Sequence, residues 1–319
     1  MLFASVLALA SPPALSQSYP SKLVRIVVTG NAGSPIDLFA RFVADQMRER
    51  FDQPFVVEGR PGAGGAIGME VVVKSQPDGH TLLAALDAHL VVSPSVYANF
   101  AVNPLRDLAP VAVLGDAIVV VLVANAGMPV QTLAEFVNYA RARPGALSYA
   151  SGGHGTYSNI VAELFLRQAQ LEVLHVPYNR PPAAVANEVV SQRVAIYMAL
   201  PPTVQQYIRA GTLRALAVAG SKRSPLLPEV PTFAEAGYPA FAPPPQSFMV
   251  LAPAHTPADV VEALNAEIQR ISAMPKMREL LAAQGAVPGA LSVAEATARL
   301  RRDTDFWSGV VKALGIKAQ

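Results

Sequence analysis

The chain has 319 residues, of which 52% are hydrophobic and 15% charged, and this composition excludes a disordered protein. Its 25 basic and 23 acidic side chains leave a formal net charge of +2, which gives no electrostatic reason to expect a nucleic-acid partner. The absence of cysteine excludes disulfides, thiolate metal sites and a cysteine-linked lipid anchor, while the length predicts two domains.

The first eighteen residues predict a secretory signal peptide. Met1 to Ala10 is almost entirely apolar, and small residues around Ala10 and Ser16 offer cleavage points. The usual basic start is missing, because the first basic residue is Lys22; a start codon placed too late would explain this. An apolar tail on a cytoplasmic protein is the alternative. We expect export to the periplasm as a soluble protein without a lipid anchor.

After this leader, short β-branched runs alternate with segments whose apolar residues recur at helical spacing. The predicted strands cover residues 24–28, 55–58, 81–85, 111–114, 117–123, 147–150, 173–176, 194–198 and 247–251. The predicted helices cover residues 37–50, 66–75, 131–143, 159–167, 182–191, 257–274 (with Thr256 as N-cap), 275–284 and 293–314. This alternation predicts an α/β fold with mainly parallel sheets flanked by helices.

Three glycine-rich loops lie between a predicted strand and a predicted helix. They cover residues 30–35, 62–65 and 151–156. At such positions backbone N–H groups and the helix dipole favour an anion. A purely structural use stays open for each loop, because glycine also permits positive φ in tight turns.

The second loop resembles a dinucleotide-binding fingerprint. Gly62, Gly64 and Gly68 follow a strand and open a helix, and Asp87 is expected at the end of the next strand. Ile67 departs from the G-x-G-x-x-G pattern, and another strand precedes the unit. An exported dinucleotide-dependent enzyme that uses Gly62–Gly68 is therefore a less favoured alternative.

Catalytic and metal motifs are absent from the sequence. The five histidines are dispersed, and no nucleophile elbow or zinc-protease motif occurs. Asp87 and His89 are expected to alternate along a strand end, where they could share a metal, but a hydrogen-bonding role is favoured. His154, inside the third glycine loop, is the histidine best placed to contact a ligand. We predict no enzyme activity, no catalytic residue, no metal and no cofactor.

Several ordered motifs carry a family resemblance that runs from Tyr19 to the C-terminus. They are Tyr19-Pro20-Ser21-Lys22, Arg60-Pro61-Gly62-Ala63-Gly64-Gly65, Pro77-Asp78-Gly79-His80-Thr81, His175-Val176-Pro177-Tyr178, Leu213-Arg214-Ala215-Leu216, Ser224-Pro225-Leu226-Leu227-Pro228 and Ala282-Ala283-Gln284-Gly285. The chain resembles the tripartite tricarboxylate transporter receptors, also called the Bug or TctC family. This resemblance implies a type II periplasmic-binding fold, in which two lobes joined by two crossing segments close on a small carboxylate.

The resemblance also implies where the ligand binds. In the first loop Gly33 and Asp37 match the family pattern, whereas Gly30 replaces a phenylalanine that walls the ligand, which predicts more room or a bulkier ligand. In the loop from Ser151, Asn159 replaces a histidine. The implied ligand-binding residues are Asn31, Gly33, Ser34, Asp37, Gly64, Asp87, His89, Ser151, Gly153, His154, Gly155, Thr156, Asn159 and Tyr178.

The expected organisation is two interleaved lobes. Residues 19–118 plus 246–319 form the first lobe and residues 119–245 the second, with the C-terminal helices returning to the first. The crossings are expected near 117–121 and 242–247, the second after a stiff proline-rich segment. Closure would be a hinge motion about these crossings.

The expected function is a monomeric receptor for a di- or tricarboxylate, an amino acid or an aromatic acid. It would deliver this ligand to the membrane components of a tripartite tricarboxylate transporter. A sensory receptor of the same fold would share every ligand contact, so this alternative stays open.

Overall fold

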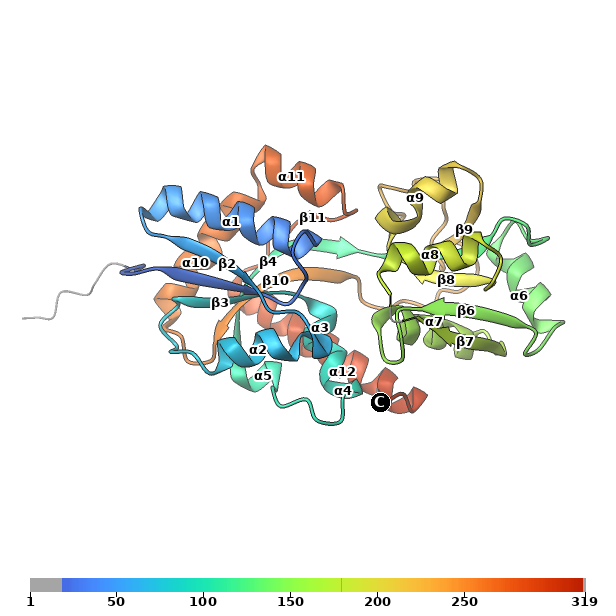
Figure 1. Ribbon diagram of the computed structural model, residues 1–319, viewed down its shortest axis with the longest axis horizontal. Helices are drawn as coiled ribbons and strands as arrows, with labels where there is room; N and C mark the ends of the chain where they lie inside the picture. The colour runs from blue at the N-terminus through green and yellow to red at the C-terminus, as the bar shows by residue number, and fades with distance from the viewer. Residues whose placement is uncertain (1–18, 179, 318–319) are drawn as a thin grey trace, which may run out of the picture.

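The structure is a computed structural model that describes residues 19–178 and 180–317, so the predicted signal peptide lies outside the described residues. Two β-sheets, each flanked by helices, form two lobes that lie side by side (Figure 1). The first lobe is built on a six-stranded sheet of order β11-β4-β10-β3-β1-β2. The second lobe is built on a five-stranded sheet of order β7-β6-β8-β5-β9.

The first lobe contains both ends of the described chain. Its strands are β1 (Val24–Val28), β2 (Phe55–Gly59), β3 (Thr81–Leu86), β4 (Leu108–Ile118), β10 (Gln246–Pro253) and β11 (Val287–Pro288). Its helices are α1 (Pro35–Phe51), a 3-10 turn at Ala63–Gly65, α2 (Ala66–Val73), α3 (Asp87–Val91), α4 (Ser93–Val96), α5 (Pro104–Asp107), α10 (Ala258–Ser272), α11 (Pro275–Ala282) and α12 (Val293–Leu314).

The second lobe is one continuous stretch of chain. Its strands are β5 (Val120–Asn125), β6 (Leu147–Ser151), β7 (Val173–Pro177), β8 (Ile196–Ala199) and β9 (Leu213–Ala219). Its helices are α6 (Leu133–Arg141), α7 (Tyr157–Gln168), α8 (Pro182–Val190) and α9 (Pro201–Arg209).

The predicted α/β class is confirmed, although both sheets are mixed. β1 pairs parallel with β2 and β3, and β6 pairs parallel with β7 and β8. β10 runs antiparallel to β3 and β4, and β5 runs antiparallel to β8 and β9; each of these two strands begins where the chain arrives from the other sheet. Each of these two strands enters its sheet directly from the other lobe, without a crossover that would restore the direction of its neighbours, so the expectation of mainly parallel sheets fails there.

Two local predictions are wrong, and two elements were not predicted. Asp87 and His89 lie in helix α3, not along a strand, because β3 ends at Leu86 and the chain turns directly into a helix. Thr256 does not cap α10; its hydroxyl donates to the Pro253 carbonyl (2.8 Å), and Pro257 holds the N-cap position. Helix α9 and strand β9 were not among the predicted elements. α9 begins with two prolines, which suit the first turn of a helix although they interrupt a helical pattern elsewhere.

The C-terminal helices return to the first lobe. Asn265 of α10 donates to the Val111 carbonyl of β4 (2.7 Å), and Ser272 of the same helix donates to the Leu114 carbonyl (3.1 Å). The predicted bounds of the last helix, 293–314, agree with α12. Its Ser292 cap and Glu295 form a capping box, which defines where this helix begins.

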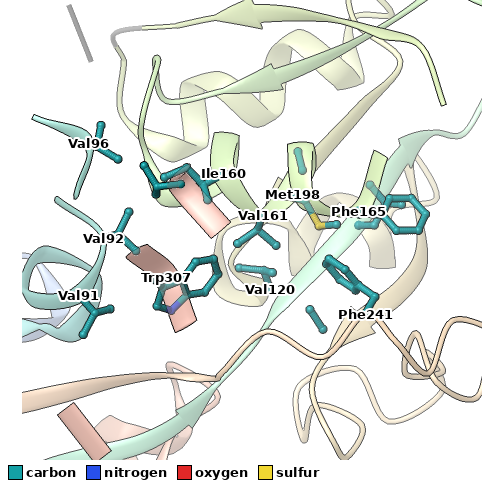
Figure 2. Close-up of a cluster of buried hydrophobic side chains, with 14 of the residues drawn as sticks. Val91, Val92, Val96, Val120, Ile160, Val161, Phe165, Met198, Phe241 and Trp307 are labelled. Atoms are coloured by element: carbon teal, nitrogen blue, oxygen red, sulfur yellow. The ribbon is translucent and has the colours of Figure 1, made fainter. Parts of the chain in front are cut away.

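A single hydrophobic cluster crosses from one lobe to the other. Figure 2 shows Trp307 of α12 between valines of the first lobe, including Val91 and Val92, and Val161 of α7. Trp307 is only 2% exposed. The lobes therefore share buried apolar surface beside the two crossings, and this contact limits how they can move relative to each other.

Candidate functional site

The carboxyl ends of the parallel strands bring the predicted ligand loops into one region. Because β1, β2 and β3 run in the same direction, their carboxyl ends share one edge of the first sheet. The same holds for β6, β7 and β8 in the second sheet. These two edges face each other across the molecule (Figure 1). In α/β sheets ligands bind outside the carboxyl ends of the strands, so this is the candidate site.

Asp37 organises the first loop from inside. Its side chain is 2% exposed, and Oδ2 accepts hydrogen bonds from the Gly33 N–H (2.9 Å) and Arg41 Nε (3.0 Å). Arg41 Nη2 donates to the other carboxylate oxygen (3.0 Å). Burial by itself raises the pKa of Asp37, but the bonds from Arg41 and Gly33 together hold that pKa below its ordinary value. The carboxylate is thus already neutralised and leaves the loop free to accept an anion.

The loop around Gly30 is tightly packed on itself. A Cβ atom at this position would lie 2.5 Å from Ser34 Oγ and 2.8 Å from Ile36 Cγ2. The loop itself fills the space that a side chain would take. Asn31 and Gly33 are exposed beside it, whereas Ser34 Oγ is buried without a hydrogen-bond partner among the described residues.

The second glycine loop is packed against helices α3 and α4. Gly62, Gly64 and Gly65 all have positive φ. A Cβ atom on Gly64 would lie 2.6 Å from the Tyr97 ring, and one on Gly65 would lie 2.8 Å from His89. The glycines therefore serve close packing and a left-handed turn, and the backbone of Gly64 is held against protein. This leaves the dinucleotide-site alternative without structural support.

Asp87 and His89 make structural hydrogen bonds at the base of the site. Asp87 is 5% exposed, and its Oδ2 accepts from the backbone N–H (2.8 Å) and the hydroxyl (2.9 Å) of Ser247. His89 Nδ1 lies 2.9 Å from Thr29 Oγ1, and burial lowers the pKa of this imidazole to about 4, which keeps it neutral. Across residues 19–178 and 180–317, no group of three or more His, Cys, Asp or Glu side chains could hold a metal ion.

The third loop is closed by its own side chains. Ser151 Oγ accepts from the Gly153 N–H (3.0 Å) and contacts His175 Nε2 (2.6 Å). Thr156 Oγ1 donates to the Gly153 carbonyl (2.8 Å), and the Gly155 N–H donates to Asn159 Oδ1 (2.9 Å). These bonds, together with one from the Gly152 N–H to Ser158 Oγ (3.2 Å), order the loop.

A polar network beneath this loop holds Asn159. Asn159 Nδ2 donates to the Tyr149 hydroxyl (2.7 Å), which in turn donates to Glu163. The Tyr149 ring stacks on His175 with centroids 4.7 Å apart, and the exposed His154 meets the other side of His175 edge-on at 4.7 Å. Burial, helped by the neighbouring His154, lowers the pKa of His175 to about 4, so this histidine is neutral at physiological pH.

Replacing Asn159 by leucine is expected to lower the free energy of unfolding by ~2–3 kcal/mol, because the Gly155 N–H and the Tyr149 hydroxyl each lose a buried partner. Urea denaturation followed by circular dichroism measures the change. Asn187→Leu is the matched control, since Asn187 is exposed on a helix and its side chain accepts a hydrogen bond from the Tyr207 hydroxyl (2.7 Å). Equal losses in the two variants would contradict a structural role for the Asn159 network.

Both helices that follow the candidate loops begin without a side-chain cap. Within the described residues, no side chain makes a capping hydrogen bond at Ser34 of α1 or at Thr156 of α7. Thr132 caps α6 and Ser292 caps α12, but α8, α9, α10 and α11 also lack a side-chain cap, so α1 and α7 differ from these four helices in the glycine-rich loops that precede them. The first-turn N–H groups of α7 are thus available to a ligand, and the helix dipole adds positive charge there.

The structure brings most of the predicted ligand residues to the two facing edges. The set from Ser151 to Asn159 lies at the end of β6, and Tyr178 lies beside it, its N–H donating to the Ser151 carbonyl (2.9 Å). Asp87 is buried, and its carboxylate accepts both of its hydrogen bonds from Ser247 of β10. Sequence reasoning missed Arg41, although its position four residues after Asp37 on a helix is a recognisable ion-pair spacing. It also missed the contact between His175 and Ser151, which no local pattern predicts.

A separate cavity of about 580 Å³ lies on the second lobe. It is lined by the start of α6, by β9 and by the segment from Glu229 to Ala236, and it includes none of the predicted ligand residues. The strand-end loops are the better candidate site, because backbone donors lie there.

None of the helices in the described part of the chain has the length and apolar character of a membrane span.

Two α/β lobes with loops at facing strand ends define a two-lobed solute-binding fold. The sequence profile described as "Tripartite tricarboxylate transporter family receptor" matches residues 39–316, and the chain belongs to this family. It is 34% identical over 306 residues to Protein BugT of Bordetella pertussis, covering 96% of this chain and 93% of that protein. The predicted family is thereby confirmed.

Solved structures share the whole fold. The structure described as R. palustris Rpa4515 with adipate is 30% identical, with a TM-score of 0.80, and the match covers 94% of this chain and 99% of that one. MatC from Rhodopseudomonas palustris with bound malate is 28% identical, with a TM-score of 0.77, and the match covers 92% and 100% of the two chains. Two such proteins are therefore described with a dicarboxylate.

Proposed function

We propose that this chain is a periplasmic receptor that captures a small carboxylate between its lobes and delivers it to the membrane components of a tripartite tricarboxylate transporter. The observation that carries the proposal is the pair of uncapped helix N-termini, at α1 and α7, that follow glycine-rich loops on facing sheet edges. The adipate and malate described in related structures support a dicarboxylate as ligand.

The charges around the site fit an acid that carries a carboxylate at each end. Asp37 is neutralised by Arg41, and His89 and His175 are neutral, so no fixed side-chain charge of these groups competes for the ligand. Recognition then rests on backbone N–H groups and helix dipoles, which bind carboxylates without an arginine clamp. We propose binding without catalysis.

The lobe boundaries follow from the same arrangement. We propose that residues 19–118 plus 246–319 move as one body and residues 119–245 as the other. A single residue, Val119, separates β4 from β5. The second crossing leads into β10 from Phe241, whose ring still packs against Phe165 of α7 in the second lobe. Both connections are short, which favours a hinge over a flexible tether.

Ligand binding is tested by thermal denaturation of the protein with adipate, malate, succinate, citrate, glutamate and benzoate. A ligand at a hundredfold excess over its Kd adds about 2.7 kcal/mol to stability and raises the melting temperature by several degrees. No shift with any member of the panel would overturn the proposed function.

Thr156→Val is expected to weaken binding of the active acid about tenfold, because the hydroxyl holds the Gly153 carbonyl and borders the free N–H groups of α7. Isothermal titration calorimetry measures the affinity. Thr132→Val is the matched control: it removes the cap of α6, a bond to the Glu135 N–H (3.2 Å), and lowers stability by ~1 kcal/mol without changing affinity. Equal affinities for the two variants would place the ligand elsewhere.

A further inference from the structure

The second crossing is held at three points by three different elements. The Tyr157 hydroxyl donates to the Pro244 carbonyl (3.4 Å). Arg299 Nη2 donates to the Pro245 carbonyl (2.9 Å). Asp87 accepts both bonds from Ser247. The segment 244–247 is therefore not a free linker.

Two of these three contacts belong to the first lobe. Arg299 on α12 is 7% exposed and also pairs with Asp116 near the end of β4 (2.6 Å) and with Asp303 (3.3 Å). It thus joins both crossings to one helix. Together with Asp87 of α3 it fixes Pro245 and Ser247 to the first lobe. Rotation about the second crossing must then take place before Pro245, which narrows the predicted hinge at 242–247 to the residues that precede Pro245.

Tyr157 supplies the one contact of the three that comes from the second lobe. It is the first residue of α7 and follows Thr156 of the third loop directly. Its ring packs edge-on against Trp307 of α12, with centroids 5.3 Å apart. Burial raises the pKa of its hydroxyl, and the nearby carboxylates of Asp87 and Asp303 raise it further, so the hydroxyl stays a donor.

We propose that Tyr157 is a positioning residue that links the loop Ser151–Thr156 to the pivot of the two lobes. The ring packs the start of α7 against Trp307 of α12, and the hydroxyl donates a hydrogen bond from the second lobe to the crossing at Pro244. Any displacement of the loop by a ligand then acts on the only one of these three contacts that the second lobe makes, and on the ring contact between Tyr157 and Trp307, which spans the lobes. This inference rests on the proposed capture of a ligand between the lobes, but the lobe orientation can be measured without any ligand.

The test measures the distance between the lobes in solution. Because the natural chain contains no cysteine, Glu49→Cys on α1 and Arg209→Cys on α9 place one spin label on each lobe, and both positions are exposed. Pulsed electron paramagnetic resonance then gives the distance distribution. Tyr157→Phe removes the hydroxyl and keeps the ring on Trp307. Without ligand, we expect this variant to show a broader or shifted distance distribution and an unchanged circular dichroism spectrum. If the unmutated protein binds adipate, the variant should bind it with an affinity at least about fivefold lower.

Tyr207→Phe is the matched control, because the Tyr207 hydroxyl contacts Asn187 (2.7 Å) within the second lobe. It should leave both the distance and the affinity unchanged. A distribution for Tyr157→Phe like that of the unmutated protein, or the same change in both variants, would overturn the inference. If the unmutated protein binds none of the acids in the panel, the proposed function is overturned instead. The inference about Tyr157 is still tested in that case, because the distances are measured without ligand.

Discussion

Replacing Arg299 by methionine should lower the free energy of unfolding by ~3–5 kcal/mol, because the buried Asp303 then keeps only its contact with the exposed Arg302, and the buried Asp87 loses the nearby positive charge of Arg299. Arg299 contacts Asp116, Asp303 and the Pro245 carbonyl while only 7% exposed. Asp303 itself is 3% exposed and cannot turn to water. Methionine keeps the apolar part of the side chain, so the loss in free energy of unfolding measures the contribution of the charge and the hydrogen bonds. Urea denaturation measures it.

Arg270→Met is the control for this substitution. Arg270 pairs with Glu267 on α10 (2.6 Å) but is 49% exposed, so its loss should change stability by less than about 1 kcal/mol. Adding Asp303→Asn to the Arg299 variant removes one of the stranded charges and should recover part of the stability. A loss no larger than that of Arg270→Met would show that the cluster at the crossings contributes no more than a surface ion pair.

Asp87→Asn should stabilise the protein above neutral pH and make its stability less dependent on pH. Burial raises the pKa of Asp87 to about 7, although the charge of Arg299 and the hydrogen bond from the Ser247 hydroxyl act to lower this pKa. The unfolded chain releases this proton at an ordinary, lower pH. Between these two pKa values the folded state binds the extra proton, so stability falls as pH rises through this window and stays low above it.

The loss of stability is bounded by the difference between the pKa of Asp87 in the folded and in the unfolded chain. At ~1.4 kcal/mol per pKa unit, the loss reaches at most about 4 kcal/mol. Asparagine keeps an acceptor for Ser247 and carries no charge at any pH. Urea denaturation at intervals from pH 4 to pH 8 should show the two proteins equal in acid and diverging toward pH 8. Parallel curves for the two proteins would mean that Asp87 titrates normally in the folded state.

Asp107→Asn gives the opposite sign and serves as the control. The bond from Arg106 holds the pKa of Asp107 below its ordinary value. Its ionised form is therefore stabilised by folding, and the contribution is present near neutral pH and is lost as the solution is acidified. The variant should be less stable than the natural protein at pH 7, with the difference closing in acid.

The three glycine loops show how one sequence signal serves different ends. The loops at residues 30–35 and 151–156 lead into helices whose first turns lack a side-chain cap, so their backbone groups can serve a ligand. The loop at residues 62–65 has the densest glycine pattern, yet Tyr97, Ser93 and His89 fill the space beside it. A glycine-rich loop indicates that the backbone needs positive φ or that another group packs closely against it. Only the tertiary structure shows whether that group is a ligand or another part of the protein.

Much of the fold follows from local pattern. The period of the apolar residues predicted the strands and most helices, and for α12 both ends agree, since Ser292 and Glu295 define its start within four residues of chain. The family motifs predicted the two-lobed fold, and Asp37, Ser151 and Tyr178 lie at the facing strand ends as expected. These signals are local because each depends on neighbours a few residues apart.

Tertiary structure decided the rest. The sequence by itself determined the α/β class, the family and the loops of the candidate site, because strand and helix periods and turn glycines act over short stretches. It could not show that Arg299 joins Asp116 to Pro245, that Asp87 is buried against Ser247, or that Tyr157 meets Trp307, since each pair is separated by 54 residues or more along the chain. The pivot between the lobes exists only once distant segments pack together and exclude water from charges that would otherwise remain solvated.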